Sequence, residues 1–349
     1  MTAGALAEVR ADLRADRRSR RRRTVVVNLA LAAACLALVV VTFCFGSVRL
    51  SIDQVVASLL HLRENPAVDF IVRDLRLPQV EAAVGVGLAL GAAGTIFQQL
   101  LRNPLASPDF VGISAGASLA AVIGIALPGV SGVGIPALAL IGGLATAVLM
   151  YALAWRDGIS GYRFILIGIG VSAFATGLTS YALTRTDLQG ARAAMHWLVG
   201  SIGQGGDDEV RVLLVAVAVL LPASLVLQRM LRSLQLGDDT ARALGAPAEL
   251  IRLVLIVVAV VLTSLATAVA GPIAFVALVA GPVADRLLRT AAGSILAAGL
   301  VGTTVVLVAD FIAVEVLPTD LPTGVVTGAI GAPYLLWLLA TTNRRGLGG

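Results

Sequence analysis

The chain has 349 residues, of which 58% are hydrophobic and only 13% are charged. Soluble domains are about half apolar and a quarter charged, so this composition excludes an ordinary soluble protein. The net charge is +5 and the mean hydropathy is +0.93, and the apolar residues gather in runs of the roughly 20 residues that a membrane span needs. These features predict an all-α, polytopic membrane protein.

The apolar runs predict about ten transmembrane helices. The eighth is short and follows the seventh through Gly271-Pro272, so this pair is either a hairpin or a re-entrant turn. The predicted spans are Thr24–Phe45, Pro78–Leu101, Phe110–Leu127, Ile135–Trp155, Phe164–Leu183, Val210–Met230, Leu250–Ala270, Ile273–Leu288, Ala291–Val314 and Thr323–Thr342.

The distribution of arginine predicts the orientation, since every basic residue of the chain is Arg. A cytoplasmic N-terminus leaves most arginines in inner segments. Those left outside are Arg49, Arg63, Arg73, Arg76, Arg185, Arg192 and Arg211. This asymmetry follows the positive-inside rule and predicts that both termini are cytoplasmic.

The arm before the first span, residues 1–23, is rich in arginine. It is either a topology anchor or a tail for anionic lipid or nucleic acid, and the anchor needs no further partner. Cys35 and Cys44 share the first span about 13 Å apart along a helix, too far for a disulfide. The two histidines, His61 and His196, show no metal-ligand spacing, so we expect neither a metal site nor a nucleic-acid partner.

The second span and the turn after it carry several small and turn-forming residues. Gly87 and Gly91 form a small-xxx-small pair that allows close approach of a neighbouring helix. Asn103-Pro104 then predicts a rigid inner turn, and Pro108 is suited to start the next helix. We expect these residues to have structural roles.

In the fifth span, Ser172, Thr176 and Ser180 recur at i, i+4 and i+8 and therefore share one helix face. Such a stripe can line a translocation path. Ordinary packing and back-bonding of hydroxyls inside a bundle explain the same spacing equally well.

The segment 234–247 interrupts the apolar sequence with a short charged stretch. Its pattern predicts a small helix that Asp238 caps and that ends at Gly245 before a proline. So short a helix is unstable alone, which favours contact with another protein over a loop helix packed on its own bundle. The contact residues are predicted to be Leu236, Gly237, Asp238, Asp239, Arg242, Leu244 and Gly245.

Enzymatic function is not supported. A Walker P-loop requires a lysine, which this chain lacks, and no catalytic constellation is present. A transporter is therefore expected. Glu81 and Asp310 are the acids nearest to spans, but both lie near an interface, where snorkelling or pairing explains them better than ion coupling. An ion-coupled secondary transporter remains the alternative.

Four stretches resemble the permease subunits of the FecCD-type family, the ATP-binding-cassette importers for ferric siderophores, haem and cobalamin. They are Arg76–Ser118, Trp197–Ile202, Gly271–Leu288 and Leu321–Leu339, with "LGDDTARALGA" resembling the family's coupling loop. Within this family, the sequence most resembles the ferric-enterobactin-like permeases. The resemblance implies ten helices in a multi-pass protein of the bacterial cytoplasmic membrane that imports an iron–siderophore complex by alternating access, with haem or cobalamin as alternative substrates.

The resemblance also implies partners. These are a cytoplasmic ATPase that holds ATP and Mg, a second permease, and an extracytoplasmic substrate-binding protein, so this chain needs no cofactor of its own. The organisation would be a basic arm (1–23), a permease domain (24–343) and a short tail (344–349). Ser172, Thr176 and Ser180 would line the path.

Two departures from the family pattern concern docking. Many members have Arg-Leu-Pro-Arg where this chain has Arg76-Leu77-Pro78-Gln79, and Pro-His where it has Pro282-Val283. Docking of the binding protein would then rest on Arg76, helped by Arg73. Both departures suit one half of a heterodimer, with a homodimer as the alternative.

Overall fold

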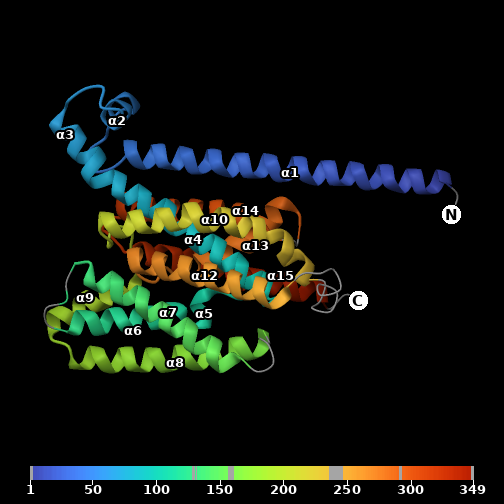
Figure 1. Cartoon of the computed structure of the whole chain (residues 1–349). Coiled ribbons are helices and arrows are strands. Elements are labelled where there is room, and N and C mark those ends of the chain that lie inside the picture. The colour runs from blue at the N-terminus through green and yellow to red at the C-terminus, as the bar shows by residue number, and fades with distance from the viewer. Residues whose placement is uncertain are drawn as a thin grey trace.

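The computed structural model describes residues 3–127, 130, 132–155, 161–235, 247–290 and 293–346, and every element it assigns there is a helix. The long helices lie side by side in one bundle (Figure 1). In chain order the elements are α1 (Ala3–Cys44), α2 (Ile52–Leu59), α3 (Pro66–Asp69), the π-helix η1 (Phe70–Arg76), α4 (Leu77–Leu100), α5 (Pro108–Val111), α6 (Ile113–Ala126), α7 (Gly134–Ala154), α8 (Gly161–Arg185), α9 (Leu188–Val199), α10 (Asp207–Gln235), α12 (Ala248–Ala270), α13 (Val276–Leu288), α14 (Ile295–Phe311), the π-helix η2 (Ile312–Val316) and α15 (Thr323–Gly346).

Each predicted span corresponds to one helix: α1, α4, α6, α7, α8, α10, α12, α13, α14 and α15. Seven helices in the described part of the chain are long and apolar enough to cross a membrane. The apolar stretches Ile113–Ala126 and Thr323–Leu338 are shorter, and α13 has 13 residues. The all-α membrane fold is confirmed, whereas the number of crossings stays a prediction.

The ends of the bundle differ in character. α1 begins and α15 ends at one end, which we call the inner end, and α2 and α3 project at the opposite, outer end (Figure 1). Both described chain ends therefore lie on one side, as an even number of spans requires. α12 and α13 run in opposite directions, and the two alternatives for this pair, a hairpin or a re-entrant turn, stay predictions. α12 ends beside the outer loop, where Ser201 N donates to Ala270 O, and α13 returns to the inner end, where Leu287 O accepts from Arg23.

The first helix is longer than the predicted span, and the third begins later. α1 continues through the basic arm and the first span as one helix of 42 residues, and the division of the chain into arm, permease domain and tail stays a prediction. At 1.5 Å per residue α1 is about 63 Å long, roughly twice the hydrocarbon thickness of a bilayer. The third span begins at Ile113 instead of Phe110, because Gly112 adopts a φ of 97° and separates the short helix α5 from α6.

Helix α4 forms the centre of the bundle and contacts α10, α12, α13 and α14. Its most extensive contact is with α14. A Cβ added to Gly87 would meet the backbone of Thr303, and one added to Gly91 would meet the carbonyl oxygen of Ala298. The close helix packing that the Gly87/Gly91 spacing predicts is present, and it places the two backbones in van der Waals contact.

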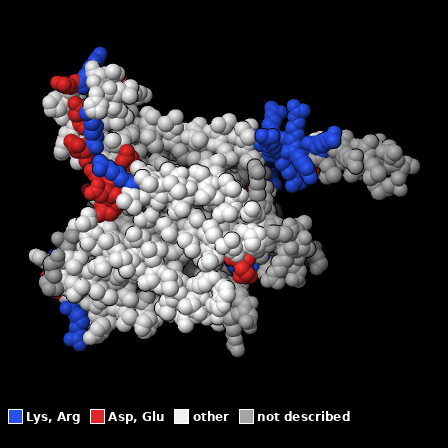
Figure 2. Space-filling model, in the orientation of Figure 1, with Lys and Arg blue, Asp and Glu red and all other residues white. Residues whose placement is uncertain are grey.

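Charged residues concentrate at the two ends. Arginines gather on α1 beside the inner end of the bundle, and acidic and basic side chains gather over the outer end, with an almost uncharged band between them on this face (Figure 2). Such a band is what a bilayer requires, since a charged side chain in hydrocarbon is costly. The distribution agrees with a bundle that spans the membrane.

Candidate functional site

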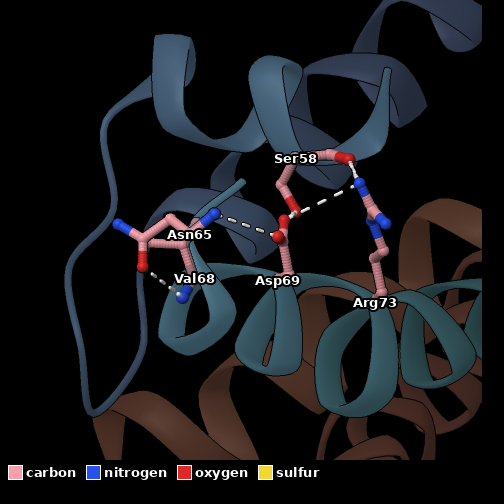
Figure 3. A network of polar contacts seen from close by, with 5 residues as sticks. All are labelled: Ser58, Asn65, Val68, Asp69 and Arg73. Atoms are coloured by element: carbon pink, nitrogen blue, oxygen red, sulfur yellow. Dashed lines mark hydrogen bonds and ion pairs between the residues drawn. The ribbon is translucent and has the colours of Figure 1, made fainter. Parts of the chain in front are cut away.

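The outer end carries a small cap built from α2, α3 and η1, which holds the two arginines predicted for docking. In the cap, Ser58 of α2 donates its hydroxyl to Asp69 Oδ1 at 2.5 Å (Figure 3). Arg73 of η1 donates Nε to the Ser58 carbonyl oxygen at 2.8 Å and lies 3.7 Å from Asp69. Asn65 caps α3 by accepting from Val68 N. Arg73 therefore fastens α2 to the start of the central helix.

Arg76 joins the cap to the end of α1. Its guanidinium donates Nη1 to the carbonyl oxygen of Phe43 and Nη2 to that of Val48, each at 2.5 Å. The residue is only 8% exposed. In this arrangement Arg76 stabilises the turn between α1 and α2, and two of its donors point into the protein. Docking of a partner by Arg76 stays a prediction, and Arg73 is the more accessible of the two.

Gln79, the residue that replaces a family arginine, has a partner that sequence reasoning did not find. Its Nε2 donates to Asp310 Oδ2 at 2.8 Å, and Thr323 Oγ1 donates to Asp310 Oδ1 at 2.8 Å. Asp310 is 3% exposed, so its predicted position near an interface does not make it snorkel. Of the two expectations for Asp310, pairing is the one that the structure shows.

Thr323 extends this network to the loop before α10. Ile202 N donates to Thr323 Oγ1 at 3.2 Å, and Gly324 N donates to Gly200 O at 2.9 Å. The start of α15 is thereby tied to α14 through Asp310, and to the outer loop through the Thr323 hydroxyl and one main-chain bond. A carboxylate that accepts from two donors is far cheaper to bury than an unpaired one.

The inner turn after α4 has the local structure that its sequence predicts. Asn103 Oδ1 accepts from Leu105 N at 2.9 Å and so forms an Asx turn, which Pro104 stiffens. Pro108 occupies the first turn of α5 behind the N-cap Ser107, so it starts this short helix and not the next span. Burial raises the pKa of the adjacent Asp109 carboxyl, although Ser114 and Ser107 donate hydrogen bonds to it.

The hydroxyl stripe lies on α8, at the periphery of the bundle (Figure 1). Thr176 and Ser180 are exposed and Ser172 is half-buried. Ser180 donates to the carbonyl oxygen of Thr176 at 3.0 Å, which is back-bonding within the helix. A Cβ on Gly170 or Gly177 would meet no atom within 4 Å. Gly170 and Gly177 lie on a neighbouring face of the same helix, so α8 is open to lipid or to a second chain around Thr176 and Ser180 and on this neighbouring face.

The predicted coupling residues Leu236, Gly237, Asp238, Asp239, Arg242, Leu244 and Gly245 lie outside the described residues. What the structure describes are the flanking helices. α10 reaches the inner end, where Gln228 Nε2 donates to Gly293 O at 2.6 Å, and α12 begins there at Ala248. The segment between them therefore connects two inner helix ends, on the side predicted to be cytoplasmic.

Comparison with known proteins agrees with this architecture. The model of the FecCD transport family matches residues 34–341. The ferric enterobactin transport system permease protein FepG of Escherichia coli is 39% identical, and the match covers 93% of this chain and 98% of FepG. The achromobactin transport system permease protein CbrC of Dickeya dadantii is 38% identical over 90% of each chain.

A solved chain of a metal-chelate type ABC transporter in an inward-facing conformation superposes with a TM-score of 0.81. It is 24% identical and covers 90% of this chain and 99% of its own length, which establishes a shared fold. The family match spans nearly all the described helices, from within α1 to within α15. The chain therefore belongs to the FecCD transport family.

Proposed function

We propose that this chain is the membrane-spanning permease subunit of an ATP-driven importer that moves a ferric siderophore complex across the cytoplasmic membrane by alternating access. The observation that carries the proposal is the family match over residues 34–341, with relatives named as permeases for ferric enterobactin and achromobactin along most of the chain. The chain itself is a transport subunit and not an enzyme.

The energy for transport would come from a separate cytoplasmic ATPase that holds ATP and Mg. This chain has no lysine and therefore no Walker P-loop of its own. The charged segment 234–247 connects inner ends of α10 and α12, where a cytoplasmic partner would reach it. Motion of that segment would move both helices, and α12 packs directly against the central helix α4.

The translocation path would lie between this chain and a second permease. The exposed face of α8 with Thr176 and Ser180 supports this arrangement, because hydroxyls and bare glycines face away from the chain's own core. The outer cap would receive the substrate-binding protein through Arg73 and Arg76. Since Gln79 already bonds Asp310 and carries no charge, a heterodimer partner would supply the missing docking charge.

Reconstitution tests the proposal. The tagged chain is purified in mild detergent, its bound partners are identified by mass spectrometry, and the complex is placed in liposomes with the binding protein and ⁵⁵Fe-enterobactin. We expect an ATPase and a second permease to copurify, and uptake to require hydrolysable ATP. Uptake that follows an ion gradient without ATP would contradict the proposed ATP-driven mechanism. Uptake of haem or cobalamin alone would contradict the assignment of a ferric siderophore as the substrate.

A further inference from the structure

A groove of about 340 Å³ lies at the outer end of the bundle, between the beginnings of α4 and α10. Its apolar lining includes Leu77 of α4 and Leu214 and Val215 of α10. The two helices pack against each other, and the outward side of α10 carries exposed aliphatic side chains such as Val215 and Val219 (Figure 1). The groove therefore opens beside a helix surface of the kind that contacts lipid, and its volume suits a small polar group.

The charged lining of the groove is balanced. Arg73 and Arg211 contribute two positive groups, and Glu81 and Asp207 contribute two negative ones. They belong to the acidic and basic side chains that gather over the outer end (Figure 2). Such a lining gives no net attraction to a ligand with a net charge, whereas a zwitterion can place each of its charges beside an opposite one. Together with the apolar lining, this balance favours a zwitterionic amphiphile.

Glu81 is the lining residue that lacks a partner. It lies one helical turn inside α4, about 6 Å along the axis from Leu77, and it is half-buried. Among the described residues its carboxylate has no hydrogen bond and no ion pair, although two arginines line the same groove. An acidic side chain within a membrane helix is costly unless it is paired. A cation from outside the chain would supply the missing partner.

The two arginines differ in how free they are to bind a ligand. Arg73 directs Nε and Nη2 to the carbonyl oxygen of Ser58, so most of its donors serve the cap (Figure 3). Arg211 lies 3.5 Å from Asp208, and the two side chains are 73% and 83% exposed. Exposed ion pairs of this kind are weak, so Arg211 can readily donate to an anionic group in the groove. Water alone can solvate Arg211 and Asp207, but it does not account for a half-buried Glu81 beside apolar side chains.

We propose that this groove binds an outer-leaflet phospholipid with a primary ammonium headgroup, such as phosphatidylethanolamine. The ammonium donates charge-assisted hydrogen bonds to the carboxylates of Glu81 and Asp207, and the phosphate accepts from Arg211. The acyl chains then follow the aliphatic side of α10 from Val215 inward. The inference requires only that the bundle spans a membrane, and it does not depend on which substrate is imported.

The full chain is freed of native lipid in detergent and titrated with three phospholipids that have the same acyl chains, and bound lipid is counted by native mass spectrometry. We expect one phosphatidylethanolamine to bind at least fivefold more tightly than phosphatidylcholine or phosphatidylglycerol. Phosphatidylcholine keeps both charges, but its quaternary ammonium donates no hydrogen bond, and phosphatidylglycerol has no cation.

Three variants test the assigned roles. Glu81→Gln/Asp207→Asn should abolish the preference for phosphatidylethanolamine. Asp74→Asn/Asp320→Asn is the matched control and should keep the preference, since it removes two exposed acids that do not line the groove. Arg211→Gln should weaken the binding of all three lipids alike, because the phosphate is common to them.

Equal affinity of the unmodified chain for the three lipids overturns the inference, and this comparison needs no variant to fold. A preference that survives in Glu81→Gln/Asp207→Asn, or that the control variant loses equally, overturns it as well. Binding of the substrate-binding protein is measured on the same variants. If Glu81→Gln/Asp207→Asn weakens that binding and leaves the lipid preference unchanged, the groove is a docking surface for the binding protein and the lipid inference fails.

Discussion

Arg76→Ala should destabilise the outer end of the molecule, because Arg76 acts as an internal tie. Its guanidinium donates to the carbonyl oxygens of Phe43 and Val48 at 2.5 Å each and is 8% exposed. Hydrogen bonds from charged donors contribute about 1.5–3 kcal/mol each. We expect a loss of about 3 kcal/mol, the lower bound for the two bonds, since the vacated carbonyls can gain water.

Thermal unfolding of the purified chain, followed by size-exclusion fluorescence, measures the effect, and limited proteolysis shows whether the cap opens. Tm should fall by several degrees, and the segment 45–65 should become sensitive to protease. Arg76→Lys should recover about half of the lost stability, because its single ammonium group replaces a guanidinium that donates to two carbonyl oxygens at once. Arg211→Ala is the control, since its side chain is 73% exposed and its ion pair contributes little.

The reasoning would be refuted by an Arg76→Ala chain with unchanged Tm and unchanged proteolysis. If that same chain failed to bind the substrate-binding protein, Arg76 would be a docking residue in place of an internal tie. Loss of stability with binding retained in the surviving folded fraction would assign docking to Arg73 or to the partner permease.

Three further predictions concern the coupling segment, helix packing and the buried acid. Arg242→Glu should leave the chain in the membrane but abolish copurification of the ATPase and ATP-driven uptake, and normal uptake would remove Arg242 from the contact. Gly91→Ala should cost about 1–3 kcal/mol in thermal unfolding, because the added Cβ meets the α14 backbone, whereas Gly170→Ala should be neutral or slightly stabilising. Gln79→Leu should lower the free energy of unfolding by about 1–3 kcal/mol, because it removes a donor from buried Asp310. Gln79→Arg should be at least as stable as the natural chain. Equal thermal stability of the natural chain and both variants would exclude the pairing.

Local sequence determined much of this protein. Each run of about 20 apolar residues forms a helix, because unpaired backbone N–H and C=O groups are costly in hydrocarbon and a helix pairs them within the segment. The Asn103-Pro104 turn and the Gly87/Gly91 contact were also predictable, since an Asx turn depends on neighbours in the chain and a glycine pair four residues apart marks one helix face. Membership of the family rested on the same local stretches.

The roles of the polar side chains inside the bundle were decided by tertiary structure. Arg76 donates to carbonyl groups 28 and 33 residues away, and Gln79 meets Asp310 across 231 residues, and neither contact could be predicted from the sequence. A cavity lined by Arg102, Arg286 and Arg289 likewise lies between the inner ends of α4 and α13, which are distant in sequence. Hydropathy and spacing report which face of one helix is apolar, and they carry no information on which polar group of another helix lies opposite. That choice is made only when the helices pack, because a buried polar group must then take whichever partner the packing brings within hydrogen-bond distance.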